Sequence, residues 1–94
     1  MSYFTISQWE ATEWTPAMEA IARDTFAPMI MSCGAASVDM VRTGGLSFAV
    51  VTKYENEATA VEAAKKIAEI RGKASTELPL RMVSEIKGAT FVSA

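Results

Sequence analysis

The stretch from Ser37 to Tyr54, which reads SVDMVRTGGLSFAVVTKY, decides the fold of this chain. Two β-forming runs flank Gly44-Gly45, and glycine adopts the positive φ angles of a tight hairpin turn without steric cost. Apolar side chains fall on both faces of the second run, with Leu46, Phe48 and Val50 on one face and Ala49 and Val51 on the other. A strand that is apolar on both faces needs a cover on each side, so we expect it to lie inside a sheet.

The chain has 94 residues, of which 50% are hydrophobic and 21% are charged. This length predicts one domain that spans residues 1–94. A domain this small buries only about 65% of its unfolded surface, and self-association is a common way to hide the remaining apolar area. The net charge is −2 and no basic cluster is present. We therefore expect neither nucleic acid nor a membrane as a partner.

The residue types that the chain lacks exclude several kinds of chemistry. There is no histidine, which excludes histidine-dependent catalytic triads, histidine-ligated zinc and histidine-ligated haem. The acidic residues are scattered, without the spacing of a metal-binding loop. We therefore expect no metal site and no cofactor.

Cysteine content and the N-terminus indicate the compartment. Cys33 is the single cysteine, so no intrachain disulfide can form and a reducing environment fits. The N-terminus lacks the basic region of a signal peptide, and Glu10 interrupts its apolar run. The longest uncharged stretch, residues 25–38, is too short to span a bilayer. These features predict a cytoplasmic protein.

The first half of the chain predicts a strand and a helix. Residues 3–10 alternate as a strand does, with Phe4 and Ile6 on one face. Thr15 followed by Pro16 is typical of a helix start. Pro28 should kink or end that helix, and Gly34 should close it, because proline lacks an amide hydrogen and glycine tolerates the left-handed conformation.

The second half predicts the hairpin strands 36–43 and 46–54, a second helix and a fourth strand. Asn56 is a good N-cap for the helix, which we expect to end near Gly72. Its expected buried face carries Val61, Ala64, Ile67, Ala68 and Arg71. The fourth strand is expected at residues 80–86, with Met82 and Ile86 on one face and Val83 on the other.

The element order β-α-β-β-α-β indicates the α+β class and a ferredoxin-like sandwich with an antiparallel sheet. Both helices should cover the same face of that sheet. The other face is then bare, and a bare apolar face marks an interaction surface. Two such sheets can pair around a two-fold axis, so we expect a homodimer.

Three features combine in a recognisable pattern: the hairpin region of residues 34–54, the Tyr54-Glu55-Asn56-Glu57 entry into an alanine-rich helix, and a closing strand with Gly88. Over nearly the whole chain this pattern resembles the dimeric α/β-barrel superfamily, in particular small members similar to antibiotic-biosynthesis monooxygenases and stress-responsive barrel proteins. The resemblance implies a dimeric α/β barrel. That superfamily includes cofactor-independent monooxygenases, haem-degrading enzymes, isomerases and proteins without an assigned function.

The chain departs from the enzyme members at two points. Monooxygenase-like members often carry an aromatic residue near the start of the second helix and a histidine further along it. Here those regions read Glu57-Ala58-Thr59 and Ala63-Ala64. A haem would therefore lack its axial ligand, and an oxygenase would need a different set of pocket residues.

Four residues are candidates for a ligand pocket, Trp9, Trp14, Arg42 and Tyr54, and no catalytic residue can be assigned. The tryptophans bracket the first strand-to-helix connection and could enclose a flat aromatic ligand, or they could pack in the core or dimer interface. Arg42 could hold an anionic or phenolate group, or form a solvated or intersubunit contact. Tyr54 could donate a hydrogen bond, or it could be a half-buried strand aromatic.

Three functions remain open. The first is binding of a small hydrophobic or aromatic metabolite. The second, implied by the resemblance, is a cofactor-independent monooxygenase or isomerase acting on a phenolic or polyketide-like substrate, and the third is a non-catalytic structural or regulatory dimer. RNA-recognition motifs share this element order, but residues 45–50 lack the leading basic residue and second aromatic that such motifs use.

Overall fold

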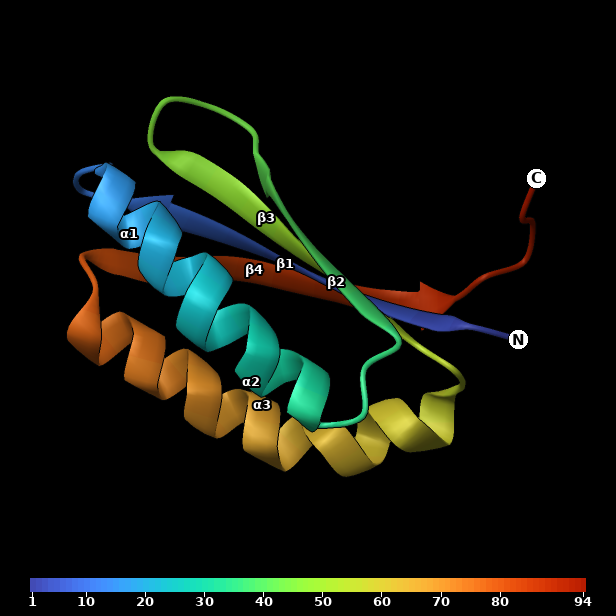
Figure 1. Ribbon diagram of the computed structural model, residues 1–94. Helices are drawn as coiled ribbons and strands as arrows, with labels where there is room; N and C mark the ends of the chain where they lie inside the picture. The colour runs from blue at the N-terminus through green and yellow to red at the C-terminus, as the bar shows by residue number, and fades with distance from the viewer.

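The sheet is built outward from the hairpin and the first strand. A computed structural model describes every residue from Met1 to Ala94. The elements are β1 (Tyr3–Ala11), α1 (Pro16–Ile21), the π-helical segment η1 (Ala22–Phe26), α2 (Ala27–Ser32), β2 (Ser37–Arg42), β3 (Ser47–Tyr54), α3 (Glu57–Glu77) and β4 (Leu80–Ala89). The strands form one sheet in the order β2-β3-β1-β4, with every neighbouring pair antiparallel. Both helical layers lie over the same face (Figure 1), which confirms the ferredoxin-like α+β fold.

The first helical segment begins, widens and ends where its sequence requires. The Thr15 side chain accepts a hydrogen bond from the amide three residues later and caps α1. Pro28 has no amide hydrogen and its ring crowds the preceding turn. The chain responds with the wider turn of η1, in which the Ala27 amide donates to the Ala22 carbonyl. Gly34, at φ 104°, ends the segment as expected.

The hairpin turn differs from the expected tight Gly44-Gly45 turn. Gly34 is the one glycine with positive φ, and β2 pairs with β3 so that Arg42 lies opposite Phe48. A two-residue turn at the glycines would instead have placed Arg42 opposite Ser47. A shift of one residue moves a side chain to the other face of the sheet. The three-residue loop, residues 44–46, is therefore what brings Arg42 to the helix side.

Helix α3 is longer than expected and buries a different face. It continues through Gly72 to Glu77 and buries Ala60, Ala63, Ile67 and Ile70. Of the expected face, Ile67 is buried and Arg71 is half-buried. Val61, Ala64 and Ala68 were wrong, because they are exposed, Val61 at 67%. Alanines occur on several sides of this helix, so its two isoleucines determine the buried stripe. A mid-helix glycine costs only about 1 kcal/mol relative to alanine, and Ala74 and Leu78 beyond it pack against the core.

Strand β4 contains a register shift that overturns one expectation. The pairing with β1 shifts between Gln8 and Trp9, so that Trp9 lies opposite Met82 while Ile6 lies opposite Ile86. Met82 and Ile86 therefore point to opposite faces, whereas uninterrupted alternation predicted a shared face. The irregularity is a β-bulge, which adds one residue to a strand. The side chains beyond it therefore point to the opposite face from the one that regular alternation predicts.

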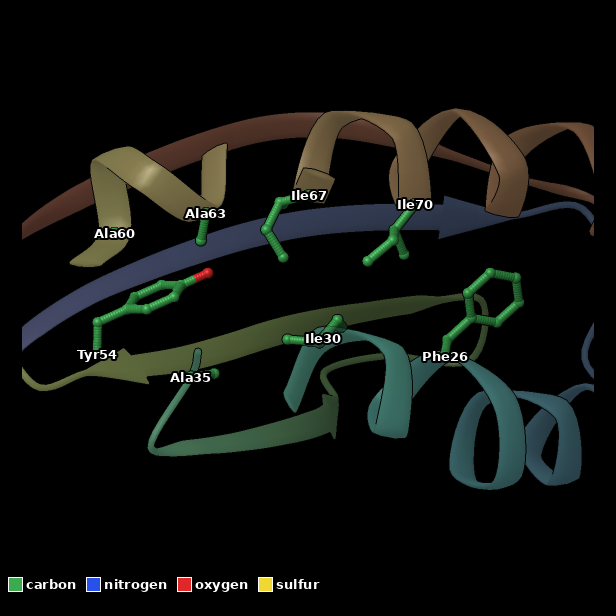
Figure 2. Close-up of a cluster of buried hydrophobic side chains, with 8 residues drawn as sticks. All are labelled: Phe26, Ile30, Ala35, Tyr54, Ala60, Ala63, Ile67 and Ile70. Atoms are coloured by element: carbon green, nitrogen blue, oxygen red, sulfur yellow. The ribbon is translucent and has the colours of Figure 1, made fainter. Parts of the chain in front are cut away.

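We call the helix-facing side of the sheet the covered face. Between it and the helices lies a core of buried residues: Phe26, Ile30, Ala35, Tyr54, Ala60, Ala63, Ile67 and Ile70. Figure 2 shows Ile67 and Ile70 of α3 pointing toward Ile30 and Phe26 of the other helical layer. The core is thus closed by both helices together.

We call the opposite side of the sheet the open face. One row across its four strands consists of Asp39, Val51, Ile6 and Ile86. Val41 is 47% exposed and Ile86 is 63% exposed, and no element of the chain covers this side (Figure 1). No helix in the structure combines the length and apolarity needed to cross a membrane.

Candidate functional site

A groove of about 430 Å³ opens between α1 and the β2–β3 hairpin. Nine of its twelve lining residues are hydrophobic, and the polar ones are Glu19, Arg23 and Arg42. We call this hollow the outer groove. Ligand pockets in proteins commonly range from about 300 to 1,000 Å³, so the outer groove is large enough for a small organic molecule.

A second hollow of about 70 Å³ lies between the sheet and the two helical layers, and we call it the inner chamber. Twelve of its fifteen lining residues are hydrophobic. Both hollows are lined by Ala22, Met40, Phe48, Leu78 and Leu80. Because these five lining residues are shared, the two hollows adjoin.

Phe48 lies at the centre of an aromatic cluster on the covered face. The strand register places Arg42, Phe48 and Trp9 in one row across β2, β3 and β1. The Trp9 and Phe48 rings stack with centroids 6.0 Å apart and an interplanar angle of 9°. Trp14 approaches the same phenylalanine edge-on, at 5.6 Å and 72°. The result is a continuous aromatic wall from the buried Trp9 to the entrance.

Trp14 and Arg42 form the entrance of the outer groove. The guanidinium carbon of Arg42 lies 4.3 Å from the Trp14 ring centroid, within the range of a cation–π interaction. Arg42 Nη2 donates to the Gly45 carbonyl at 2.6 Å, and Trp14 Nε1 donates to Glu19 Oε2 at 2.7 Å. These contacts hold both side chains in place and connect the hairpin to the start of α1.

The two arginines of the outer groove differ in their charge partners. Arg23 forms a two-point contact with Asp24, with N–O distances of 3.0 and 3.1 Å. That hydrogen bond holds the pKa of the Asp24 carboxyl below its usual value and raises the pKa of Arg23. Arg42 is in none of the ion pairs of the structure, which join Arg23, Arg71 and Arg81 to carboxylates. Arg42 is therefore the groove cation that can accept an external anionic partner.

The polar residues of the inner chamber are Ser7, Thr52 and Arg71. Ser7 and Thr52 are 3% and 4% exposed. Trp9 Nε1 donates to Ser7 Oγ at 2.8 Å. Arg71 Nη2 lies 2.5 Å from Glu85 Oε2 in a half-buried ion pair, so its charge is already balanced.

Tyr54 lies outside both hollows. It is 1% exposed and belongs to the core between α3 and the sheet. Burial disfavours the phenolate, and the nearby Cys33 adds to this effect, so the pKa of Tyr54 is raised above its ordinary value. No group of three or more acidic, cysteine or histidine side chains is placed to hold a metal ion.

Of the four residues suggested by the sequence, the structure gathers Trp9, Trp14 and Arg42 and leaves Tyr54 apart. The residue that joins them, Phe48, was visible in the sequence only as an apolar strand position. The rule of alternation placed it on a face, but its neighbours depended on the length of the hairpin turn. The buried hydroxyls of the inner chamber carried no sequence signal, since serine and threonine are common on strands and at turns.

Comparison with solved structures identifies the fold of the chain. No family model matches the chain, and no curated protein matches its sequence. Among solved structures, SnoaB, a cofactor-independent oxygenase from Streptomyces nogalater, superposes with a TM-score of 0.74 at 7% identity, over 98% of this chain and 95% of that one. An ethyl tert-butyl ether d (EthD) family protein from Bacillus halodurans superposes with a TM-score of 0.72 at 14% identity, over 97% of this chain and 100% of that one. A dimeric ferredoxin-like protein from an uncultured marine organism gives 0.67 at 7% identity, over 100% and 98%.

The chain has a ferredoxin-like fold, which it shares with these solved structures. Each match covers both chains almost completely, so the likeness in fold extends over the whole chain. At identities of 7–14% these matches establish a shared fold.

Proposed function

We propose that this protein is a homodimeric, cytoplasmic α/β-barrel protein that binds a small, flat, hydrophobic or aromatic metabolite in the outer groove. The main support for this proposal is an apolar groove of about 430 Å³, at whose entrance Arg42 lies against the ring of Trp14. Aromatic walls favour a flat ligand through ring stacking. The groove is open to solvent through a polar entrance, as a metabolite site requires.

The sizes of the two hollows decide which one holds the body of the ligand. An apolar cavity of about 150 Å³ is what a benzene molecule occupies in an engineered protein. The inner chamber, at about 70 Å³, is smaller than that. The body of the ligand therefore lies in the outer groove, and only a small substituent reaches the inner chamber.

Arg42 supports a ligand that carries an anionic or phenolate oxygen at the entrance. Its guanidinium contacts one carbonyl and one aromatic ring, which leaves further N–H donors free. Hydrogen bonds from a charged donor to an anion are about twice as strong as neutral ones. A ligand with one acidic oxygen would therefore bind in a fixed orientation.

A cofactor-independent monooxygenase or isomerase is the second candidate. The observation that favours it is again Arg42, because a cation beside a phenolic substrate stabilises the phenolate that reacts. The chain has no histidine to remove the proton, and Tyr54 lies outside the groove. These two facts make binding the better supported function. Uptake of oxygen with a panel of polyphenols that Arg42→Gln abolishes would establish the catalytic alternative.

The open face supports the homodimer. Its central row of Val51, Ile6 and Ile86 is aliphatic, and sheets of this kind pack face to face at about 10 Å. A structural or regulatory dimer without a ligand would use the same face but would leave the groove without a role.

Equilibrium dialysis with 2-naphthoate tests the binding proposal. Wild-type protein should bind this aromatic anion, and Arg42→Gln should weaken binding by about tenfold to a hundredfold, since one charge-assisted hydrogen bond contributes about 1.5–3 kcal/mol. Lys65→Gln removes an equally exposed cation from the outer side of α3 and should leave the affinity unchanged. Equal affinity in all three proteins, or none in the wild type, would contradict the proposal.

A further inference from the structure

Two hydroxyl groups lie in a part of the pocket that is otherwise apolar. Ser7 on β1 and Thr52 on β3 line the inner chamber and are more than nine-tenths buried, at 3% and 4% exposure. Ser7 lies opposite Val50, two residues from Thr52, on the covered face. The Cα atoms of such diagonal neighbours on adjacent strands are about 7–8 Å apart, and their Cβ atoms are somewhat closer. At this spacing one ligand oxygen atom can lie between the two hydroxyl groups.

Both hydroxyls can donate a hydrogen bond into the chamber. Trp9 Nε1 donates to Ser7 Oγ, which occupies one acceptor position and leaves the hydroxyl proton of Ser7 available. The Thr52 hydroxyl forms no hydrogen bond within the chain, and the structure has no fully enclosed side-chain oxygen or nitrogen without a partner. The Thr52 hydroxyl therefore reaches the chamber that Thr52 lines.

The chamber favours a neutral acceptor. Its remaining polar residue, Arg71, is already paired with Glu85, so no free positive charge is present to attract an anion. A ligand that fills the chamber displaces water from both hydroxyls, so binding is favourable when the ligand itself brings an oxygen acceptor. The volume of about 70 Å³ accommodates about two water-sized groups, which matches a carbonyl with one small substituent.

We infer that Ser7 and Thr52 form a carbonyl-recognition end of the pocket, and that the ligand is an aromatic ketone or related aromatic carbonyl compound. Its ring system lies in the outer groove and its carbonyl oxygen accepts from both hydroxyls in the inner chamber. This inference rests on the proposed binding function and names the class of ligand. It also makes Ser7 a specificity-determining residue while it holds Trp9 in the aromatic wall.

The test uses two probes that differ in one oxygen, 2-acetylnaphthalene and 2-ethylnaphthalene, in equilibrium dialysis. Wild-type protein should bind the ketone about fivefold to tenfold more tightly, the factor expected from one net hydrogen bond. Thr52→Val keeps the shape of the side chain and should reduce this preference to about one while the affinity for 2-ethylnaphthalene stays the same or rises. Ser7→Ala should reduce the preference independently of Thr52.

Thr5→Val provides the matched control. Thr5 lies directly opposite Thr52 on the same face of the sheet but lines neither hollow, so it should retain the wild-type preference. Binding of both probes with no preference for the ketone, or a preference that survives in Thr52→Val and Ser7→Ala, overturns this inference and leaves the binding function intact. Failure of the wild type to bind either probe, while it binds 2-naphthoate, overturns this inference alone. Failure to bind all three compounds refutes the binding function and the inference together.

Discussion

The two faces of this sheet carry apolar residues in different ways. The covered face presents large rings, among them Trp9, Phe48 and Tyr54, beneath two helical layers. The open face presents mainly aliphatic side chains, with Phe4 as its one aromatic ring, and it has no cover. The contrast in exposure is large: 1% for Tyr54 against 63% for Ile86. Large rings under helices leave irregular gaps that become a groove. Short aliphatic side chains form an even surface that suits a second sheet.

The largest effect is expected when the covered face loses volume. Ile67→Ala removes a buried side chain of α3, 9% exposed, and should lower the free energy of unfolding by about 2–5 kcal/mol, because a core cavity adds to the lost burial. Urea denaturation at a fixed protein concentration measures this. Val61→Ala on the outer side of the same helix should change stability by less than about 0.5 kcal/mol. Equal losses in the two variants would show that the helix buries a different face.

A smaller effect is expected at the open face. Ile86→Lys places an unpaired charge on the proposed dimer surface, which should cost about 2 kcal/mol of association and raise the dimer Kd roughly thirtyfold. The monomer should fold normally, because Ile86 is 63% exposed within one chain. Sedimentation equilibrium at micromolar concentration measures the change.

Val61→Lys is the control for this experiment, since Val61 is 67% exposed on the far side of α3. It should leave the Kd unchanged. A wild-type protein that is monomeric at micromolar concentration would contradict the homodimer and the assigned role of the open face.

The smallest effect is expected in how the free energy of unfolding depends on pH. The pKa of Tyr54 is raised above the ordinary value of 10.0, so the stability that this phenol contributes is complete below pH 10 and is lost as the pH rises through the folded-state pKa. Wild-type protein should therefore lose more stability between pH 9 and pH 11 than Tyr54→Phe, in parallel urea titrations. An identical pH dependence in both proteins would show that Tyr54 is not desolvated in the folded state.

The sequence was sufficient for the element order, the sheet type and the bare face, because strand alternation and helix caps are local signals. It failed where a single residue changes the register. The hairpin loop, residues 44–46, is one residue longer than a two-glycine turn, and the bulge near Trp9 reverses the facing of part of β4. Both depend on contacts between strands, which local patterns do not contain.

The candidate site was predictable in its parts but not in its assembly. Trp9, Trp14 and Arg42 were identifiable by residue type, since large rings and guanidinium groups are typical of binding sites. Their grouping around Phe48 follows from the hairpin register. Tyr54 lies outside the groove because it is at the far end of β3. Its residue type alone does not reveal this position.

The two tryptophans give the molecule a pair of built-in optical reporters with different surroundings. Trp9 is enclosed at 5% exposure and hydrogen-bonded to a hydroxyl, whereas Trp14 is only half-buried and hydrogen-bonded to a carboxylate. Their emission spectra should therefore differ, with the enclosed indole at shorter wavelength. Replacing either one by phenylalanine would yield a protein whose fluorescence follows a single location, so that events at the surface and in the interior could be timed separately.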